Sequence, residues 1–71
     1  MEYIKVTVPG REKDDFDVLI NGEKNGKTGE TIILGSSGFV IISVDLPGAE
    51  EKTVDVKNTT ADHPMPVEVT V

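Results

Sequence analysis

The stretch from Val18 to Gly48 decides the fold of this chain; it reads VLINGEKNGKTGETIILGSSGFVIISVDLPG. Its apolar residues come in short runs rich in valine and isoleucine, and Asn-Gly, Gly-Ser-Ser-Gly and Pro-Gly separate these runs. Successive side chains of a strand point to opposite faces, so alternating apolar residues are typical of strands, and the separating residues are those that tight turns favour. No window shows the i, i+3, i+4, i+7 apolar spacing of an amphipathic helix. We therefore predict an all-β protein.

The same pattern continues towards both ends of the chain. A short strand between the two Asn-Gly pairs raises the expected number of strands from six to seven. Short strands with turn signals every eight to twelve residues predict a small two-layer antiparallel β-sandwich. A polar loop is expected before the last strand, at Asn58–Pro66. The other expected strands are Glu2–Val8, Phe16–Asn21, Glu30–Leu34, Phe39–Leu46, Lys52–Lys57 and Val67–Val71.

Length and charge limit what such a protein can do. The 71 residues are expected to form one domain, residues 1–71, because a chain of this size buries only about 60% of the surface that its unfolded form exposes. The formal net charge of -6 repels phosphate backbones and anionic lipid, so we expect neither nucleic acid nor a membrane as partner. The absence of cysteine excludes disulfides and thiolate metal sites.

Targeting signals are not evident in the sequence. The N-terminal segment MEYIKVTVPGRE lacks the basic region and apolar run of a signal peptide, and the longest apolar run, Phe39–Ile42, is too short to span a bilayer. We expect a cytoplasmic protein if residues 1–71 are the native chain. A domain excised from a larger extracytoplasmic protein would have the same features, and this alternative stays open.

The segment NGEKNGKT, which ends at Thr28, is similar to part of a nucleotide-binding phosphate loop. Gly22 and Gly26 enclose only three residues where that loop requires four, and glycine and β-branched residues follow the motif where a helix should begin. We therefore expect no nucleotide and no other cofactor. Gly22 and Gly26, and Gly48 further along, are instead predicted to be turn residues, the first two with positive φ.

The order of these features resembles the PEGA-domain family. Over Val18–Val56 an apolar strand is followed by Asn-Gly, a few polar residues, Gly-Lys-Thr, an apolar strand, a glycine, a strongly apolar strand and Pro-Gly. The chain departs from the family pattern at Gly29, where proline is usual, and at Ala49, where an aromatic residue is usual. The resemblance implies an immunoglobulin-like or transthyretin-like β module, usually attached to other domains or found at cell surfaces, and it implies no catalytic residues.

Two groups of titratable residues could suggest a metal site or acid–base chemistry. Asp14, Asp15 and Asp17 gather carboxylates, but alternation separates Asp14 from the other two, so we interpret them as part of a solvated acidic segment. His63 is the only histidine, which is too few for the usual zinc site and leaves no nucleophile beside it. We therefore predict no metal and no catalytic residue.

Two short motifs are also interpreted as surface structure. Ser36 and Ser37 lie in Gly-Ser-Ser-Gly, but neither has the glycine spacing of a hydrolase nucleophile, so a turn is expected. Asn58 begins an acceptor triplet for N-glycosylation, but without an export signal the triplet is weak evidence that the residue is glycosylated.

The expected strand Phe39–Leu46 is more apolar than a half-buried strand needs to be. Val40, Ile42, Val44 and Leu46 are expected to face the core, which leaves Phe39 and Ile41 on the outer face. We predict that this pair, joined by Ile33 on a neighbouring strand, forms an interaction face. The alternative is that the N-terminal segment or a loop covers it.

The function predicted from the sequence is a non-enzymatic accessory module that binds a protein partner or forms a homo-oligomer. A structural or spacer domain of a larger envelope or surface protein is the alternative. No paired carboxylates, histidine pair or metal cluster appears at a spacing that would serve an enzyme. The free edge of the C-terminal strand is a second route to a partner, because its backbone groups can pair with another strand.

Overall fold

Seven strands form the protein in a computed structural model that describes residues 1–71. The strands confirm the all-β prediction, and no helix is present. They are β1 (Glu2–Thr7), β2 (Asp17–Ile20), β3 (Glu23–Lys27), β4 (Thr31–Leu34), β5 (Gly38–Val44), β6 (Lys52–Val56) and β7 (Met65–Glu68).

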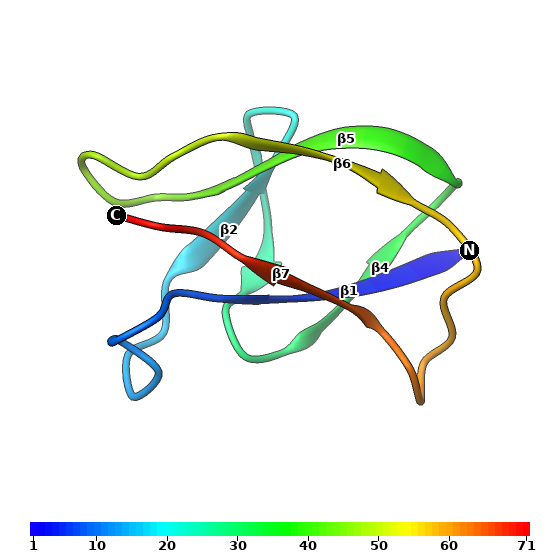
Figure 1. Cartoon of the computed structure of the whole chain (residues 1–71), viewed down its shortest axis with the longest axis horizontal. Helices are drawn as coiled ribbons and strands as arrows, with labels where there is room; N and C mark the ends of the chain where they lie inside the picture. The colour runs from blue at the N-terminus through cyan, green and yellow to red at the C-terminus, as the bar shows by residue number, and fades with distance from the viewer.

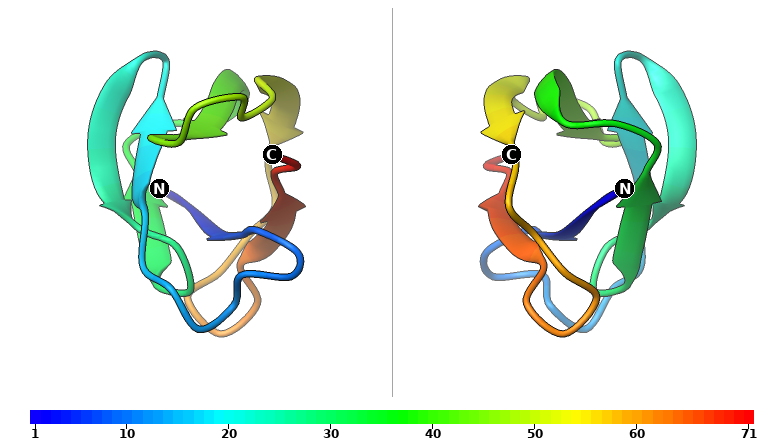
Figure 2. Two further views of the ribbon diagram at one scale, coloured as in Figure 1. Left: turned by 90° about the vertical axis from the view of Figure 1, so that its left-hand side faces the viewer. Right: turned by 90° about the vertical axis from the view of Figure 1, so that its right-hand side faces the viewer.

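The strands are divided between two sheets that pack into the predicted small sandwich (Figure 1). One sheet has three strands in the order β4-β1-β7, and the other has four in the order β3-β2-β5-β6. The views along the long axis show the two sheets on either side of a common interior (Figure 2). Each sheet therefore has one face on the core and one face towards solvent, which is the condition for alternating sequences.

The strand order shows whether the sandwich has the topology of a constant-type immunoglobulin domain, which the sequence leaves open. In a constant-type immunoglobulin domain the first strand pairs with the second, and the third lies in the opposite sheet from the second. Here β1 pairs with β4 and β7, while β2 pairs with β3 and β5. The order is thus not that of a constant-type immunoglobulin domain. One pairing, between β1 and β7, is parallel, and the other four are antiparallel.

The twelve buried core residues are all aliphatic; ten come from the inner faces of the two sheets, and Val8 and Val69 lie just beyond β1 and β7. Alternation places them there, because every second residue of a strand points inward. Each fully buried valine or isoleucine side chain contributes about 1.5–3 kcal/mol, so this layer is the main source of stability. The twelve core residues are Ile4, Val6, Val8, Val18, Ile20, Ile32, Leu34, Ile42, Val44, Val56, Val67 and Val69.

The hairpin between β2 and β3 explains both Asn-Gly pairs. Asn21 and Gly22 have φ values of 51° and 85°, as a type I′ turn requires, and the pairing of Ile20 with Glu23 leaves only these two residues in the loop. Gly26 also has a positive φ, of 82°, but it lies inside β3 rather than in a turn. The prediction of a turn at Gly26 is therefore wrong. The register of β2 and β3 shifts at this point, and glycine accommodates the resulting β-bulge.

The chain changes sheets directly after this bulge. The Thr28 amide donates to the Phe16 carbonyl at 2.9 Å, beside the β2 sheet, and the Gly29 amide donates to the Val6 carbonyl of β1 at 2.9 Å. The buried Thr28 hydroxyl accepts a bond from the Phe16 amide at 3.1 Å. The Lys27 ammonium lies 2.9 Å from the Asp17 carboxylate. The Gly-Lys-Thr segment thus holds the crossover between the sheets.

The last strand differs from its expected position. It covers Met65–Glu68 instead of Val67–Val71, so it begins inside the expected polar loop. Its parallel partner β1 ends at Thr7, opposite Glu68, and the ladder stops there. Val69 follows with one further bond, from its amide to the Thr7 carbonyl at 2.9 Å, and it is fully buried.

Candidate interaction surface

Phe39 and Ile41 lie in β5 and point away from the core. The exposed fraction is 75% for Phe39 and 43% for Ile41, whereas Ile42 is fully buried. Neither the N-terminal segment nor a loop removes the pair from solvent, so the alternative of a covered pair does not hold. Two exposed apolar side chains two residues apart on one strand form a continuous apolar strip on the outer face of the four-stranded sheet.

The neighbouring strands hold this strip in place. The Asn21 amide donates to the Ile41 carbonyl at 2.8 Å, and the Ile41 amide donates to the Asn21 side-chain oxygen at 2.9 Å. The β2–β3 turn is thereby fastened to β5 beside Ile41. On the other side Phe39 is opposite Asp55, and Ile41 is opposite Thr53. The backbone of Ile41 is therefore held from both sides, by the β2–β3 turn and by β6, whereas Phe39 is paired with β6 alone.

Charged side chains gather on the same outer face at the Asp45 end of β5, beyond Ser43 and away from Phe39. The Asp17 carboxylate lies 2.9 Å from the Lys27 ammonium and 3.6 Å from the Lys24 ammonium, which is also 3.7 Å from Asp45. The hydrogen bond from Lys27 lowers the pKa of Asp17, and the same bond raises the pKa of Lys27. On the β6 side Lys57 lies 3.3 Å from Asp55. Asp55 is opposite Phe39, so this ion pair borders the strip directly.

Ile33 does not belong to this surface, which corrects the prediction that it joins Phe39 and Ile41. Ile33 is exposed, at 56%, but it lies in β4, and β4 and β5 belong to different sheets. The outer faces of two stacked sheets point in opposite directions. Ile33 instead pairs with Tyr3 of β1 on the outer face of the three-stranded sheet.

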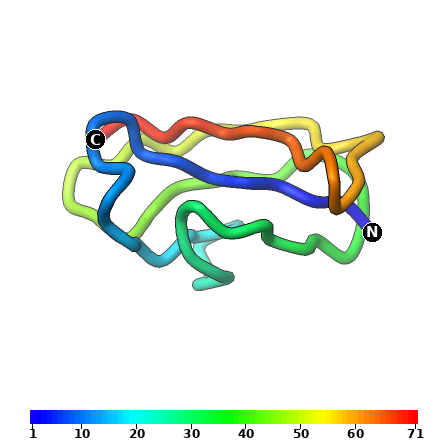
Figure 3. Tube along the Cα trace, turned by 90° about the horizontal axis from the view of Figure 1, so that it is seen from below, coloured from blue at the N-terminus to red at the C-terminus, as the bar shows by residue number.

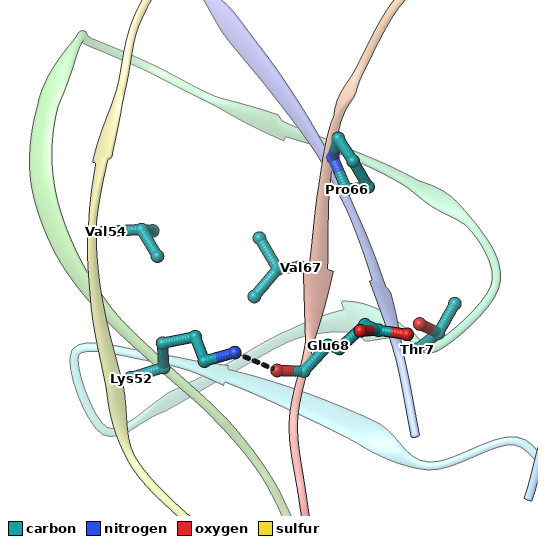
Figure 4. Close-up of a pocket in the computed structure, with 6 residues that line it drawn as sticks. All are labelled: Thr7, Lys52, Val54, Pro66, Val67 and Glu68. Carbon is teal, nitrogen blue, oxygen red and sulfur yellow. Dashed lines mark hydrogen bonds between the residues drawn. The ribbon is translucent and has the colours of Figure 1, made fainter. Parts of the chain in front are cut away.

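The seam between β6 and β7 contains the larger hollow of the molecule, of about 390 Å³ (Figure 4). These strands are edge strands of opposite sheets, and the side chains of Val54 and Val67 line the gap between them. At one end the Lys52 ammonium donates to the Glu68 carbonyl at 2.6 Å. The lining has one ammonium, one carboxylate and the Thr7 hydroxyl, and its other residues are Val54, Val67 and Pro66.

The other residues considered from the sequence are dispersed. Asp17 is held by lysines, as described above, and His63 is exposed in the loop before β7. No three acidic or histidine side chains gather in a way that could hold a metal ion. The Ser37 hydroxyl donates to the carboxylate of Glu2, so the Gly-Ser-Ser-Gly turn has a structural contact far along the chain.

Glu2 is the polar residue that sequence reasoning missed. Its side chain is buried at the start of β1, where it accepts bonds from Ser37 and from the amide and hydroxyl of Thr59, at 2.9 and 2.5 Å. The Ser37 hydroxyl, followed by Thr59, lowers the pKa of Glu2 from 4.5 to about 2. The only signal in the sequence was that a glutamate occupies an inward position of a strand, next to Ile4 and Val6 on the same face.

Comparison with protein-family models, with curated proteins and with solved structures gave no match to this chain. The chain also forms no helix with the length and apolar character that crossing a membrane would need. The surfaces of the sandwich are the candidate functional sites.

Proposed function

We propose that this protein is a non-enzymatic accessory module that binds another protein through the outer face of the four-stranded sheet. The observation that carries the proposal is the exposure of Phe39 and Ile41 side by side on β5. Burying apolar area contributes about 25 cal/mol for each Å², and aromatic side chains dominate many interfaces, so Phe39 would be the main anchor. The resemblance to PEGA domains, which are commonly attached to other domains, is in keeping with an accessory role.

The charged side chains on the same face would give such a contact its specificity. Asp55 lies opposite Phe39 and pairs with Lys57, and Asp17, Lys24 and Asp45 lie further along the same face, at the Asp45 end of β5. Rim charges change association rates and partner choice more than they change affinity. We therefore expect a partner whose contact surface has an apolar pocket for Phe39 and polar groups around it.

The test compares the wild type with Phe39→Glu and with a matched control, Ile33→Glu. Both substitutions place a carboxylate at an exposed apolar position, but on opposite faces of the sandwich. Each variant is immobilised, proteins are captured from native lysate, and bound proteins are quantified by mass spectrometry, with the folded state checked by circular dichroism. We expect a distinct set of proteins to bind the wild type and Ile33→Glu, and to be lost from Phe39→Glu.

Two results would contradict the proposal. If all three proteins capture the same set, the strip on β5 is not the binding surface. If Phe39→Glu unfolds while Ile33→Glu does not, Phe39 has a role in stability that its exposure does not explain. A wild type that captures nothing specific and runs as a monomer in size-exclusion chromatography with light scattering would favour a spacer domain.

A further inference from the structure

Four strands have a free edge, because each sheet has two ends: β4 and β7 in one sheet, β3 and β6 in the other. A free edge exposes backbone groups that can pair with another chain, and proteins usually block such edges with charges, proline or bulges. Three of these four edges are blocked in that way.

The three blocked edges differ in how they are protected. Strand β3 has a bulge, and its residues Glu23–Lys27 are exposed and largely charged. Strand β7 contains Pro66, and the Lys52 ammonium occupies the Glu68 carbonyl. Strand β6 carries Lys52 and Asp55, with Lys57 directly after it. None of these edges offers an uninterrupted, uncharged backbone to a second strand.

Strand β4 lacks every one of these devices. Its sequence, Thr-Ile-Ile-Leu, has no charge and no proline, and β-branched residues of this kind favour strands. Apart from the ladder with β1, Thr31–Leu34 make no backbone or side-chain hydrogen bond. Seen from below, β4 runs along the border of the molecule for most of its length (Figure 3). The apolar side chain of Ile33 is exposed on this strand as well.

The backbone of β4 presents its free groups at Ile33. Tyr3 is the partner of Ile33 in the antiparallel ladder, but the Tyr3 amide donates to the Thr59 hydroxyl at 2.7 Å, on the side away from β4. Hydrogen-bonded and non-hydrogen-bonded pairs alternate along such a ladder, so Tyr3 and Ile33 form a non-hydrogen-bonded pair. The amide and carbonyl of Ile33 therefore point outward, to the free edge.

We propose that β4 pairs antiparallel with β4 of a second copy of this chain, about a twofold axis at Ile33. The two Ile33 residues would exchange both backbone hydrogen bonds, and the two three-stranded sheets would become one continuous sheet of six strands. Residues directly opposite share a face, so the two exposed Ile33 side chains would also cover each other. The same register pairs Thr31 with Gly35 of the second copy.

The charges of the protein favour this edge for self-association. Two copies with a net charge of -6 repel each other, so a contact between them needs a surface without carboxylates. β4 is such a surface, and the proposed register places Glu30 opposite Ser36 of the second copy rather than opposite Glu30. This edge is separate from the strip at Phe39, so the inference goes beyond the proposed function and does not depend on it.

The test is analytical ultracentrifugation of wild type, Ile33→Lys and Phe39→Lys over a series of concentrations. Ile33→Lys places two ammonium groups opposite each other at the twofold axis, and such like-charge contacts are strongly unfavourable. We expect the dimerisation of Ile33→Lys to be at least about tenfold weaker than that of wild type, and Phe39→Lys to dimerise like wild type. Circular dichroism confirms that each variant is folded.

Crosslinking provides a second measurement that needs no charged substitution. The chain has no cysteine, so Ile33→Cys introduces a single thiol, and opposite residues in a hydrogen-bonded pair have Cα atoms about 5.5 Å apart. A short bis-maleimide should join two copies of Ile33→Cys and leave the control Phe39→Cys monomeric. Three results would each overturn the proposal. The wild type could stay monomeric at every concentration, or Phe39→Lys could disrupt the dimer while Ile33→Lys does not. The third is equal crosslinking of both cysteine variants.

Discussion

Replacing Gly26 with alanine should lower the free energy of unfolding far more than replacing Gly22 does. The two glycines lie in the same hairpin and have nearly the same backbone conformation. The φ values are 82° for Gly26 and 85° for Gly22. A Cβ at Gly22 would meet no atom within 4 Å, whereas a Cβ at Gly26 would lie 2.9 Å from Cγ1 and 3.1 Å from Cδ1 of Ile32. Ile32 belongs to β4 and is buried, so this contact joins the two sheets.

The loss of stability has two contributions, the backbone conformation of the new residue and its packing against Ile32. An L-residue in the left-handed region costs about 1–2 kcal/mol, and alanine recovers about 0.4–1 kcal/mol by restricting the unfolded chain. Gly22→Ala should therefore lower the free energy of unfolding by about 1 kcal/mol. Gly26→Ala adds the overpacking of a core, which typically costs about 1–3 kcal/mol, so its total should be about 2–4 kcal/mol.

Urea unfolding followed by far-ultraviolet circular dichroism measures both losses on the same scale. The double variant Gly26→Ala/Ile32→Ala tests the cause, because removing the isoleucine side chain removes the clash. The double variant should be more stable than the sum of the two single losses predicts, by about 1–3 kcal/mol. Equal losses for Gly22→Ala and Gly26→Ala, within about 0.5 kcal/mol, would show that close packing of β3 on β4 does not constrain Gly26.

Two further predictions concern single side chains. The pKa of Glu2 is lowered to about 2, chiefly by the Ser37 hydroxyl and then by Thr59. The stability that these bonds provide is therefore complete above pH 4.5, the ordinary pKa, and is lost as the pH falls towards 2. Urea midpoints should therefore decline over this range in wild type and decline less in Glu2→Gln; equal pH profiles would contradict this role. Asn25 should deamidate faster than Asn21, because the Asn21 side chain is held by a backbone amide of β5, whereas Asn25 is exposed at the bulge and makes no side-chain hydrogen bond. In this reaction the amide nitrogen of the following glycine attacks the side-chain carbonyl carbon and ammonia leaves. Peptide mapping of protein aged at mildly alkaline pH should locate the modification at Asn25. Faster modification of Asn21 would refute this prediction.

Much of the fold could be predicted because strand positions and turns depend on local properties of the chain. The turn at Asn21 and Gly22 follows from residues that tolerate positive φ, and the exposure of Phe39 and Ile41 follows from alternation along one strand. The error at Gly26 arose because Asn-Gly suits a bulge as well as a turn. Only the pairing with β2 distinguishes these two roles.

The sequence by itself determined that the chain forms short strands with one aliphatic face, which residues point outward, and that Asn21-Gly22 reverses the chain. The tertiary structure alone decided which strands share a sheet, and therefore that Ile33 and Phe39 lie on opposite surfaces. It also decided the parallel pairing of β1 with β7 and the burial of Glu2 against Thr59, 57 positions away. The physical reason is that side-chain alternation is a property of each strand, whereas strand order depends on how distant segments pack together, which no local pattern specifies.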